Sequence, residues 1–307
     1  MTRPTPDTAR ESAAAYGVRP PGYRLPDATH VGHVVLQVAD LARSLAYYEH
    51  VLGFRVLGRA DTGVTLAAHG DPTPLIELRE RPGAPPVPRR GRLGLYHFAV
   101  LLPDRGALGR FVAHLAELGE YAGMSDHLVS EAIYLTDPDG LGIEVYADRP
   151  RAEWQTDGRQ IVMQTEPLDV PDLLRAGGGR PWTGMPAGTV IGHVHLFVAD
   201  LDAATVFYHT GLGFDKTVWN YPGALFLSAG GYHHHLGTNT WAAHAPRPEP
   251  GDARLVEWVI VVPDRAAVDD AARSMAAAGH PVTTTDDGWT AADPWGTRIR
   301  IVAGARR

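Results

Sequence analysis

The chain contains a long internal repeat, which restricts the folds available to it more than any other feature of the sequence. Residues 31–54, VGHVVLQVADLARSLAYYEHVLGF, match residues 191–214, IGHVHLFVADLDAATVFYHTGLGF, at an offset of 160. The same offset aligns Pro103–Asp104 with Pro263–Asp264, and it falls to 156 near the end of each half. A fixed repeat distance indicates repeated structural units. We therefore interpret the chain as a tandem duplication.

Each half divides again into two units with the same order of elements. Residues 33–38 alternate as a strand does, and Asp40 stands where the N-cap of a helix over 41–51 belongs. The other elements expected of the first half are strands at 54–59, 63–68, 74–79 and 96–103, a helix at about 105–118, and strands at 131–136 and 142–147. The pattern is β-α-β-β-β, four times in all. It predicts an α+β fold in which four βαβββ units pair into two cup-shaped mixed-sheet domains.

The repeat also predicts the domain boundaries. We expect an N-terminal arm at 1–29, a first cup-shaped domain at 30–150, a connector at 151–189 and a second cup-shaped domain at 190–307. The arm is rich in Pro, Ala and charge and lacks the apolar segment of a signal peptide, so we expect it to be disordered or loosely draped. One unit cannot close a sheet alone, whereas two paired units form a cup that can hold a ligand.

Composition excludes several classes of function. The net charge is -7, and a nucleic-acid partner would need a basic patch. No apolar run approaches the roughly 18 residues of a membrane span. The chain has no cysteine, which excludes disulfides and thiolate metal sites and is compatible with a cytoplasmic protein. We expect a soluble protein with a small-molecule partner and possible assembly into a homo-oligomer.

Polar residues recur at equivalent strand positions of the first half. Side chains two apart on a strand share one face, so His33, His97 and Glu144 are predicted to face one cup, with Glu77 as a possible fourth ligand. Two imidazoles and one carboxylate are the ligand set of non-haem Fe(II) oxygenases. Four ligands that include two Glu would instead suit a Zn(II) or Ni(II) isomerase.

The second half carries a different set of candidates. His193 persists at the position equivalent to His33, Glu257 replaces the second histidine, and Arg300 replaces the carboxylate. The run YHHHLGTNTW adds His235, so His193, His235 and Glu257 form an alternative site of two His and one Glu. The cationic Arg300 would disfavour a divalent cation there, or would bind an anionic group of a substrate.

Two further residues are candidates for catalysis. Tyr134, in EAIYLTDPDG, stands near the predicted ligands on a strand, where its phenol could donate a hydrogen bond to a bound oxygen. His127, in SDHLVSEAIY, precedes the same strand and could act as an acid or base near neutral pH.

Several of these segments together resemble a known family. HVVLQVADLARSLAYYEHVLGF, YHFAVLLP and IYLTDPDGLGIEVY resemble signatures of the vicinal oxygen chelate superfamily, which includes the glyoxalases and extradiol dioxygenases. GLYHFAV, SDHLVSEAIYLTDPDG, IGHVHLFVADL and AGGYHHHLGTNTW resemble the two-domain catechol-2,3-dioxygenase-like proteins of Gram-positive bacteria. The resemblance covers roughly residues 30–303.

The resemblance implies a mononuclear Fe(II), or sometimes Mn(II), bound by two His and one Glu. It also implies a catechol or hydroquinone substrate that is cleaved with O2. By motif, His33, His97 and Glu144 take the ligand positions, and Tyr134 takes that of the tyrosine that hydrogen-bonds the substrate. The sequence departs from well-known extradiol enzymes, which keep their metal in the second half, because Arg300 occupies the Glu position there. We favour the N-terminal ligand set, since all three of its residues match.

Two other functions are compatible with the sequence. One is a glyoxalase-like isomerase or lyase reaction at a Zn(II) or Ni(II) site that includes Glu77. The other is metal-free binding of a small molecule, as in an antibiotic-sequestering protein of the same fold. The metal that binds distinguishes the first from a dioxygenase, because an isomerase needs neither O2 nor a redox metal.

Overall fold

The four repeated units are present in the structure, a computed structural model that describes residues 16–88 and 91–304. The first unit comprises β1 (His30–Val38), α1 (Leu41–His50), β2 (Arg55–Ala60), β3 (Gly63–Ala67) and β4 (Ile76–Glu80). The second comprises β5 (Gly94–Leu101), α2 (Arg105–Leu118), β6 (Gly123–Asp126), β7 (Ser130–Thr136) and β8 (Gly142–Asp148). The predicted α+β order is confirmed. The strand β6, with the sequence GMSD, was not among the segments predicted.

The second half repeats this order. The third unit comprises β11 (Val190–Phe197), α4 (Leu201–Ala204) continued by the π-helical segment η2 (Thr205–Gly211), β12 (Asp215–Val218), β13 (Ala224–Ser228) and β14 (Leu236–Asn239). The fourth comprises β15 (Arg254–Val262), α5 (Arg265–Ala277), β16 (Thr283–Thr284), β17 (Gly288–Ala292) and β18 (Arg298–Ala303). The segment between the halves contains η1 (Arg151–Glu153), β9 (Thr156–Asp157), β10 (Gln160–Ile161) and α3 (Val170–Ala176).

Each unit begins its helix in the same way. An aspartate in extended conformation precedes the helix, and its carboxylate accepts a hydrogen bond from the backbone N–H three residues later. Such a cap satisfies one of the N–H groups that the first turn leaves without a partner. The four capping residues are Asp40, Asp104, Asp200 and Asp264.

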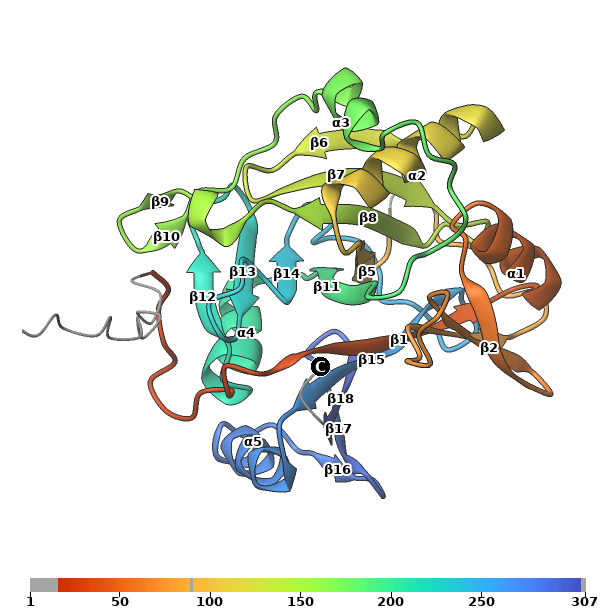
Figure 1. Cartoon of the computed structure of the whole chain (residues 1–307). Coiled ribbons are helices and arrows are strands. Elements are labelled where there is room, and N and C mark those ends of the chain that lie inside the picture. The colour runs from red at the N-terminus through yellow and green to blue at the C-terminus, as the bar shows by residue number, and fades with distance from the viewer. Residues whose placement is uncertain (1–15, 89–90, 305–307) are drawn as a thin grey trace, which may run out of the picture.

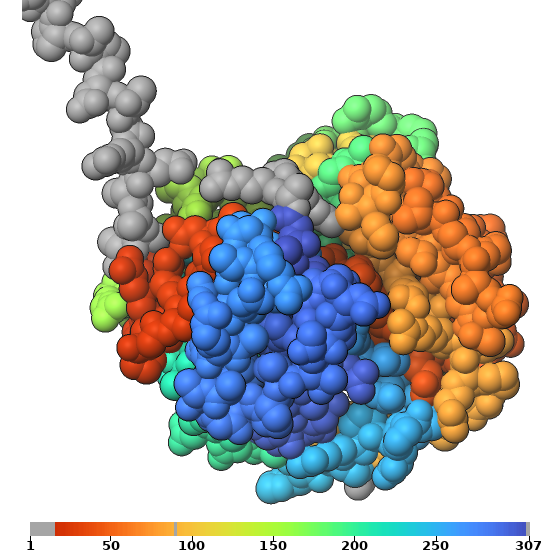
Figure 2. Space-filling model, turned by 90° about the horizontal axis from the view of Figure 1, so that it is seen from below, coloured from red at the N-terminus to blue at the C-terminus, as the bar shows by residue number. Residues whose placement is uncertain are grey.

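The units pair across the two halves of the chain. One eight-stranded sheet has the order β16-β17-β18-β15-β1-β4-β3-β2 and joins the first unit to the fourth. The other has the order β12-β13-β14-β11-β5-β8-β7-β6 and joins the third unit to the second (Figure 1). We call these the outer sheet and the inner sheet. Seen from below, the first and fourth units lie side by side on one face (Figure 2).

This pairing corrects the expectation that residues 30–150 and residues 190–307 each close their own cup. The junctions are antiparallel ladders between first strands, β1 with β15 and β5 with β11. All four first strands carry a similar apolar pattern, so the sequence pattern does not determine which two of them meet.

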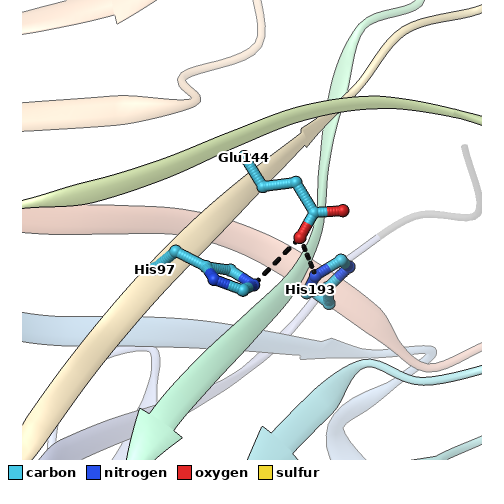
Figure 3. A group of neighbouring side chains, drawn as sticks. All are labelled: His97, Glu144 and His193. Carbon is cyan, nitrogen blue, oxygen red and sulfur yellow. Dashed lines mark hydrogen bonds and ion pairs between the residues drawn. The ribbon is translucent and has the colours of Figure 1, made fainter. Parts of the chain in front are cut away.

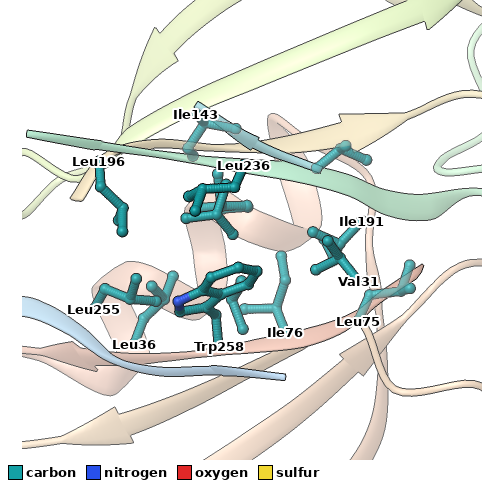
Figure 4. Packing of buried hydrophobic residues seen from close by; sticks show 14 of the residues in the cluster. Val31, Leu36, Leu75, Ile76, Ile143, Ile191, Leu196, Leu236, Leu255 and Trp258 are labelled. Carbon is teal, nitrogen blue, oxygen red and sulfur yellow. The ribbon is translucent and has the colours of Figure 1, made fainter. Parts of the chain in front are cut away.

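The two sheets pack against each other through a shared apolar core (Figure 4). Trp258 of β15 is fully buried there, among residues of both sheets. Those from the outer sheet include Leu36 and Ile76, and those from the inner sheet include Ile143 and Leu236. The sheets therefore face each other with their apolar sides, and each turns its other side away from the shared core.

The described part of the arm, residues 16–29, lies against the third unit. Val18 forms a β-bridge with Lys216, and the Arg24 guanidinium donates to both carboxylate oxygens of Asp215 at 2.7–3.0 Å. Leu25 is buried in the shared core. Residues 16–29 are thus held by specific contacts, while the rest of the predicted arm, residues 1–15, lies outside the described residues. Among the helices of the described ranges, none has the length and apolar character required to cross a membrane.

Candidate metal centre

Three buried side chains of the inner sheet converge on one point: His97 of β5, Glu144 of β8 and His193 of β11 (Figure 3). One potential ligand atom from each lies within 4.8 Å of the others. His97 Nε2 is 2.9 Å from Glu144 Oε2, and His193 Nε2 is 3.2 Å from the same oxygen. Within residues 16–88 and 91–304, this is the one group of three such side chains close enough to share an ion.

The register of the sheet explains why they meet. Glu144 of β8 and His193 of β11 are both cross-strand partners of Ala99, one on each side of β5. His97 precedes Ala99 by two residues and shares its face. The small side chain of Ala99 leaves space in the middle, so the two imidazoles and the carboxylate turn toward one another.

Burial and charge set the protonation of these groups. Burial of Glu144 alone would raise its pKa, but pairing with His193 and His97 outweighs burial and holds the Glu144 pKa well below its usual value. Burial lowers the pKa of His193 to about 4. At neutral pH Glu144 is therefore a carboxylate and His193 a neutral imidazole, and these are the forms that bind a metal ion.

The donor set suits a redox-active divalent metal. His97 Nδ1, His97 Nε2 and His193 Nδ1 are buried without a hydrogen-bond partner among the described residues, although buried polar atoms are normally satisfied. His97 Nε2 thus approaches the Glu144 carboxylate without the alignment of a hydrogen bond. Two imidazoles and one carboxylate, with remaining positions open, are the ligands of mononuclear non-haem Fe(II) sites. These three residues fit such an ion.

His33 does not belong to this group, which corrects the prediction that it shares a cup with His97 and Glu144. His33 lies on β1 of the outer sheet, where burial lowers its pKa and the charges of Glu77 and Arg300 act on that pKa in opposite directions. The error follows from the unit pairing, because His193 of the third unit, and not His33 of the first, meets the second unit. The predicted fourth ligand, Glu77, also lies in the outer sheet, where its carboxylate accepts a 2.7 Å hydrogen bond from Arg79 Nε.

The alternative site of His193, His235 and Glu257 is not assembled either. Glu257 lies on β15 of the outer sheet, where Arg300 stands 3.8 Å from it and also pairs with Asp287 at 2.5 Å. His235 Nδ1 accepts a 3.2 Å hydrogen bond from the backbone N–H of Ala229. Of these three residues, only His193 belongs to the converging group of His97, Glu144 and His193.

A cavity of about 210 Å³ adjoins the group. Its walls come from the inner sheet and the loops beside it, and from the connector, which supplies Met163, Gln164 and Thr165. The remaining lining residues are Tyr96, His97, Ser125, His127, Ser130, Tyr134, Glu144, His195, Tyr221, Phe226, His234 and Trp241. Two of the predicted candidates, Tyr134 and His127, therefore line the same cavity as His97 and Glu144.

Tyr134 and His127 form a hydrogen-bonded pair. Tyr134 of β7 is the cross-strand partner of Glu144, and its hydroxyl lies 2.7 Å from His127 Nε2. His127 Nδ1 lies 2.7 Å from the backbone carbonyl of Gln164. A carbonyl only accepts, so Nδ1 carries the proton and, in the neutral ring, Nε2 accepts from Tyr134. Burial, followed by the charge of Glu144, raises the Tyr134 pKa well above its usual value.

Two buried histidines of the cavity were not singled out by the sequence analysis. His195 follows His193 by two residues on the same face, and its Nε2 lies 3.0 Å from Asn239 Nδ2. His234 has its ring 4.0 Å from that of His193, and its Nδ1 lies 2.7 Å from His233 Nδ1. Burial lowers the pKa of both His195 and His234 well below the usual value. The period-two spacing of His193 and His195 was the available signal for the first of them.

Three comparisons place these observations among known proteins. The model of the Glyoxalase/Bleomycin resistance protein/Dioxygenase superfamily matches residues 30–145 and 190–301. Over 270 residues the chain is 46% identical to a catechol-2,3-dioxygenase of Bacillus subtilis (strain 168), covering 87% of this chain and 94% of that protein.

Solved structures share the fold. A putative dioxygenase from Bacillus subtilis has a TM-score of 0.62 at 15% identity, covering 92% of this chain and 86% of its own. Glyoxalase I from Zea mays has a TM-score of 0.54 at 17% identity, covering 90% of this chain and 92% of its own. At these identities the likeness concerns the fold alone.

Proposed function

Because the chain belongs to the glyoxalase/bleomycin resistance protein/dioxygenase superfamily, we propose that it is a metal-dependent extradiol dioxygenase that cleaves a catechol-like ring with O2. The observation that carries the proposal is the convergence of His97, Glu144 and His193 in the inner sheet. The named relative, a catechol-2,3-dioxygenase, supports the same reaction class. Fe(II) is the preferred metal and Mn(II) the second choice.

The residues of the cavity have distinct tasks. His97, Glu144 and His193 would hold the ion, and an ion bound there would supply Lewis acidity and redox chemistry toward the diol and O2. Tyr134 positions a substrate oxygen next to Glu144, since Tyr134 on β7 is the direct cross-strand partner of Glu144 on β8. Without substrate, the Tyr134 hydroxyl donates its single proton to His127 Nε2. When that hydroxyl donates to the substrate oxygen instead, Nε2 is free to take a proton.

A glyoxalase-like isomerase or lyase is the second candidate. Such a site would use four protein ligands, including Glu77, at Zn(II) or Ni(II). Glu77 and Glu257 lie in the outer sheet, and the group in the inner sheet contains a single carboxylate. A metal-free binding function is disfavoured because His97 Nδ1, His97 Nε2 and His193 Nδ1 have no hydrogen-bond partner among the described residues, whereas buried polar atoms are normally satisfied. The geometry therefore favours the dioxygenase.

The proposal is tested with protein purified without O2 and loaded separately with Fe(II), Mn(II) or Zn(II). We expect the Fe(II) or Mn(II) protein to consume O2 with catechol and to release a ring-opened product that contains both atoms of ¹⁸O2, detected by mass spectrometry. The Zn(II) protein should consume none. Absence of O2 uptake with every catechol or hydroquinone, combined with anaerobic isomerisation of a thiohemiacetal, would replace the proposal by the isomerase.

Replacing Tyr134 by phenylalanine tests its positioning task. We expect kcat to fall about 100-fold, because a preorganised donor contributes most where charge develops, while substrate affinity changes much less. Metal content should stay at the wild-type level. A fall in affinity equal to the fall in kcat would instead make Tyr134 a general binding residue.

A further inference from the structure

A second and larger cavity continues from the first. Its volume is about 710 Å³, and we call it the outer cavity and the 210 Å³ one the inner cavity. The two share four lining residues, Tyr96, His97, Tyr134 and Trp241. Of these, Tyr96 and Trp241 lie closest to the surface, at 36% and 50% exposed. The boundary between the cavities therefore contains two partly exposed aromatic side chains at the rim of the inner sheet.

Tyr96 owes its position to an irregularity in the sheet. Adjacent residues of β11, His195 and Leu196, pair with His97 and Leu95 of β5, so Tyr96 is an extra residue without a partner. Such a β-bulge re-aims a side chain and is frequent beside functional sites. The bulge needs space on the neighbouring strand: a Cβ on Gly142 would lie 2.0 Å from the Tyr96 carbonyl oxygen.

Because of the bulge, two consecutive residues point into the same cup. The Tyr96 ring lies 4.8 Å from that of His97 and 5.2 Å from that of His195. It also contacts Phe197 at 4.7 Å and Trp241 at 5.7 Å. A regular strand would place Tyr96 on the opposite face from His97. Tyr96 thus forms a wall that stands next to the proposed metal ligand.

The two cavities differ in size and in chemistry. A cavity of about 150 Å³ holds one benzene molecule, so 210 Å³ accommodates a single ring with its hydroxyls and little more. Among the described residues, the outer cavity is lined by aromatic, aliphatic and small residues such as Phe197, Val87 and Ala242, and none of these described residues is Asp, Glu, Lys or Arg. These residues offer apolar surface to an alkyl substituent and no opposite charge to a charged one.

We propose that Tyr96 is a specificity-determining residue: it partitions the two cavities and sets the width of the apolar ring substituent that passes into the outer one. This inference rests on the proposed catechol-type substrate. A catechol with an unbranched alkyl group at the ring passes beside the Tyr96 phenol, whereas a branched group of the same carbon number meets it.

The test measures binding without turnover. Dissociation constants of 4-butylcatechol and 4-tert-butylcatechol are determined by anaerobic titration calorimetry with the Fe(II)-loaded protein. In the wild type, butyl should bind at least tenfold tighter than tert-butyl, because a tert-butyl group stopped at Tyr96 leaves its carbons unburied, whereas each methylene that the butyl chain buries contributes about fourfold in affinity. In Tyr96→Ala the ratio should fall to about threefold or less, while Tyr96→Phe should keep the wild-type ratio.

A matched control is Tyr121→Ala, because Tyr121 is 92% exposed and lines neither cavity; it should keep the wild-type ratio. An unchanged ratio in Tyr96→Ala, or equal binding of both catechols by the wild type, would overturn the inference. O2 uptake with catechol is measured on the same samples. If the protein consumes O2 but Tyr96→Ala leaves the ratio of dissociation constants unchanged, only the proposed role of Tyr96 is refuted. If the ratios are as expected but no O2 is consumed, only the proposed dioxygenase activity is refuted.

Discussion

His193→Ala is expected to remove the metal and with it the activity, while leaving the fold intact. The substitution deletes one of three converging ligands and leaves the buried carboxylate of Glu144 with His97 alone. Loss of a group that merely hydrogen-bonds a ligand costs about 10- to 100-fold in metal affinity or activity, so loss of the ligand itself should cost more. Metal content by elemental analysis and O2 uptake measure the effect, and circular dichroism checks the fold.

The matched control is His33→Ala. His33 occupies the equivalent repeat position in the outer sheet, near Glu77 and Arg300. Among the residues that the structure describes, it belongs to no group that could hold an ion. It should keep wild-type metal content and turnover. If His33→Ala lost the metal and His193→Ala retained it, the assignment of the site to the inner sheet would be wrong.

Trp258→Ala is expected to lower stability more than any surface substitution. The indole is fully buried between the two sheets, and truncating such a side chain costs about 3–5 kcal/mol through lost burial and the cavity left behind. That is a large part of the roughly 5–15 kcal/mol by which proteins are stable. Urea unfolding, followed by circular dichroism, should give a midpoint well below that of the wild type.

Tyr121→Ala provides the comparison, because Tyr121 is 92% exposed. Surface substitutions of this kind usually stay within about 0.5 kcal/mol, so its midpoint should match the wild type. Equal midpoints for Trp258→Ala and Tyr121→Ala would show that the two sheets do not depend on a common core.

Much of the fold could be predicted because local signals repeat four times. The aspartate caps, the period-two strands and the constant offset each depend on residues close in the chain, so the helices and most strands lie where they were expected. Strand β6 was missed because GMSD contains no β-branched or aromatic residue, the types enriched in strands. The pairing of units was missed because it depends on which strand edges meet, which no local pattern encodes.

The same limit applies to the site. His97, Glu144, His127 and Tyr134 were identified within one unit, and the structure brings them to one cavity. The third member of the converging group came from a different unit, so choosing between His33 and His193 required the pairing. Tyr96 was not singled out, since its position results from an extra residue in β5 and a regular alternation would turn it away.

The order of the units along the chain has a consequence for assembly. The strands of the inner sheet come from one continuous stretch, residues 94–239, whereas the outer sheet joins residues 30–80 to residues 254–303. Closing contacts between distant segments is slow, because the loop entropy is lost before the contacts form. During synthesis the cup that contains His97, Glu144 and His193 can therefore close while β1, which also pairs with β4, still awaits β15. One edge of the first strand made is thus among the last to be paired.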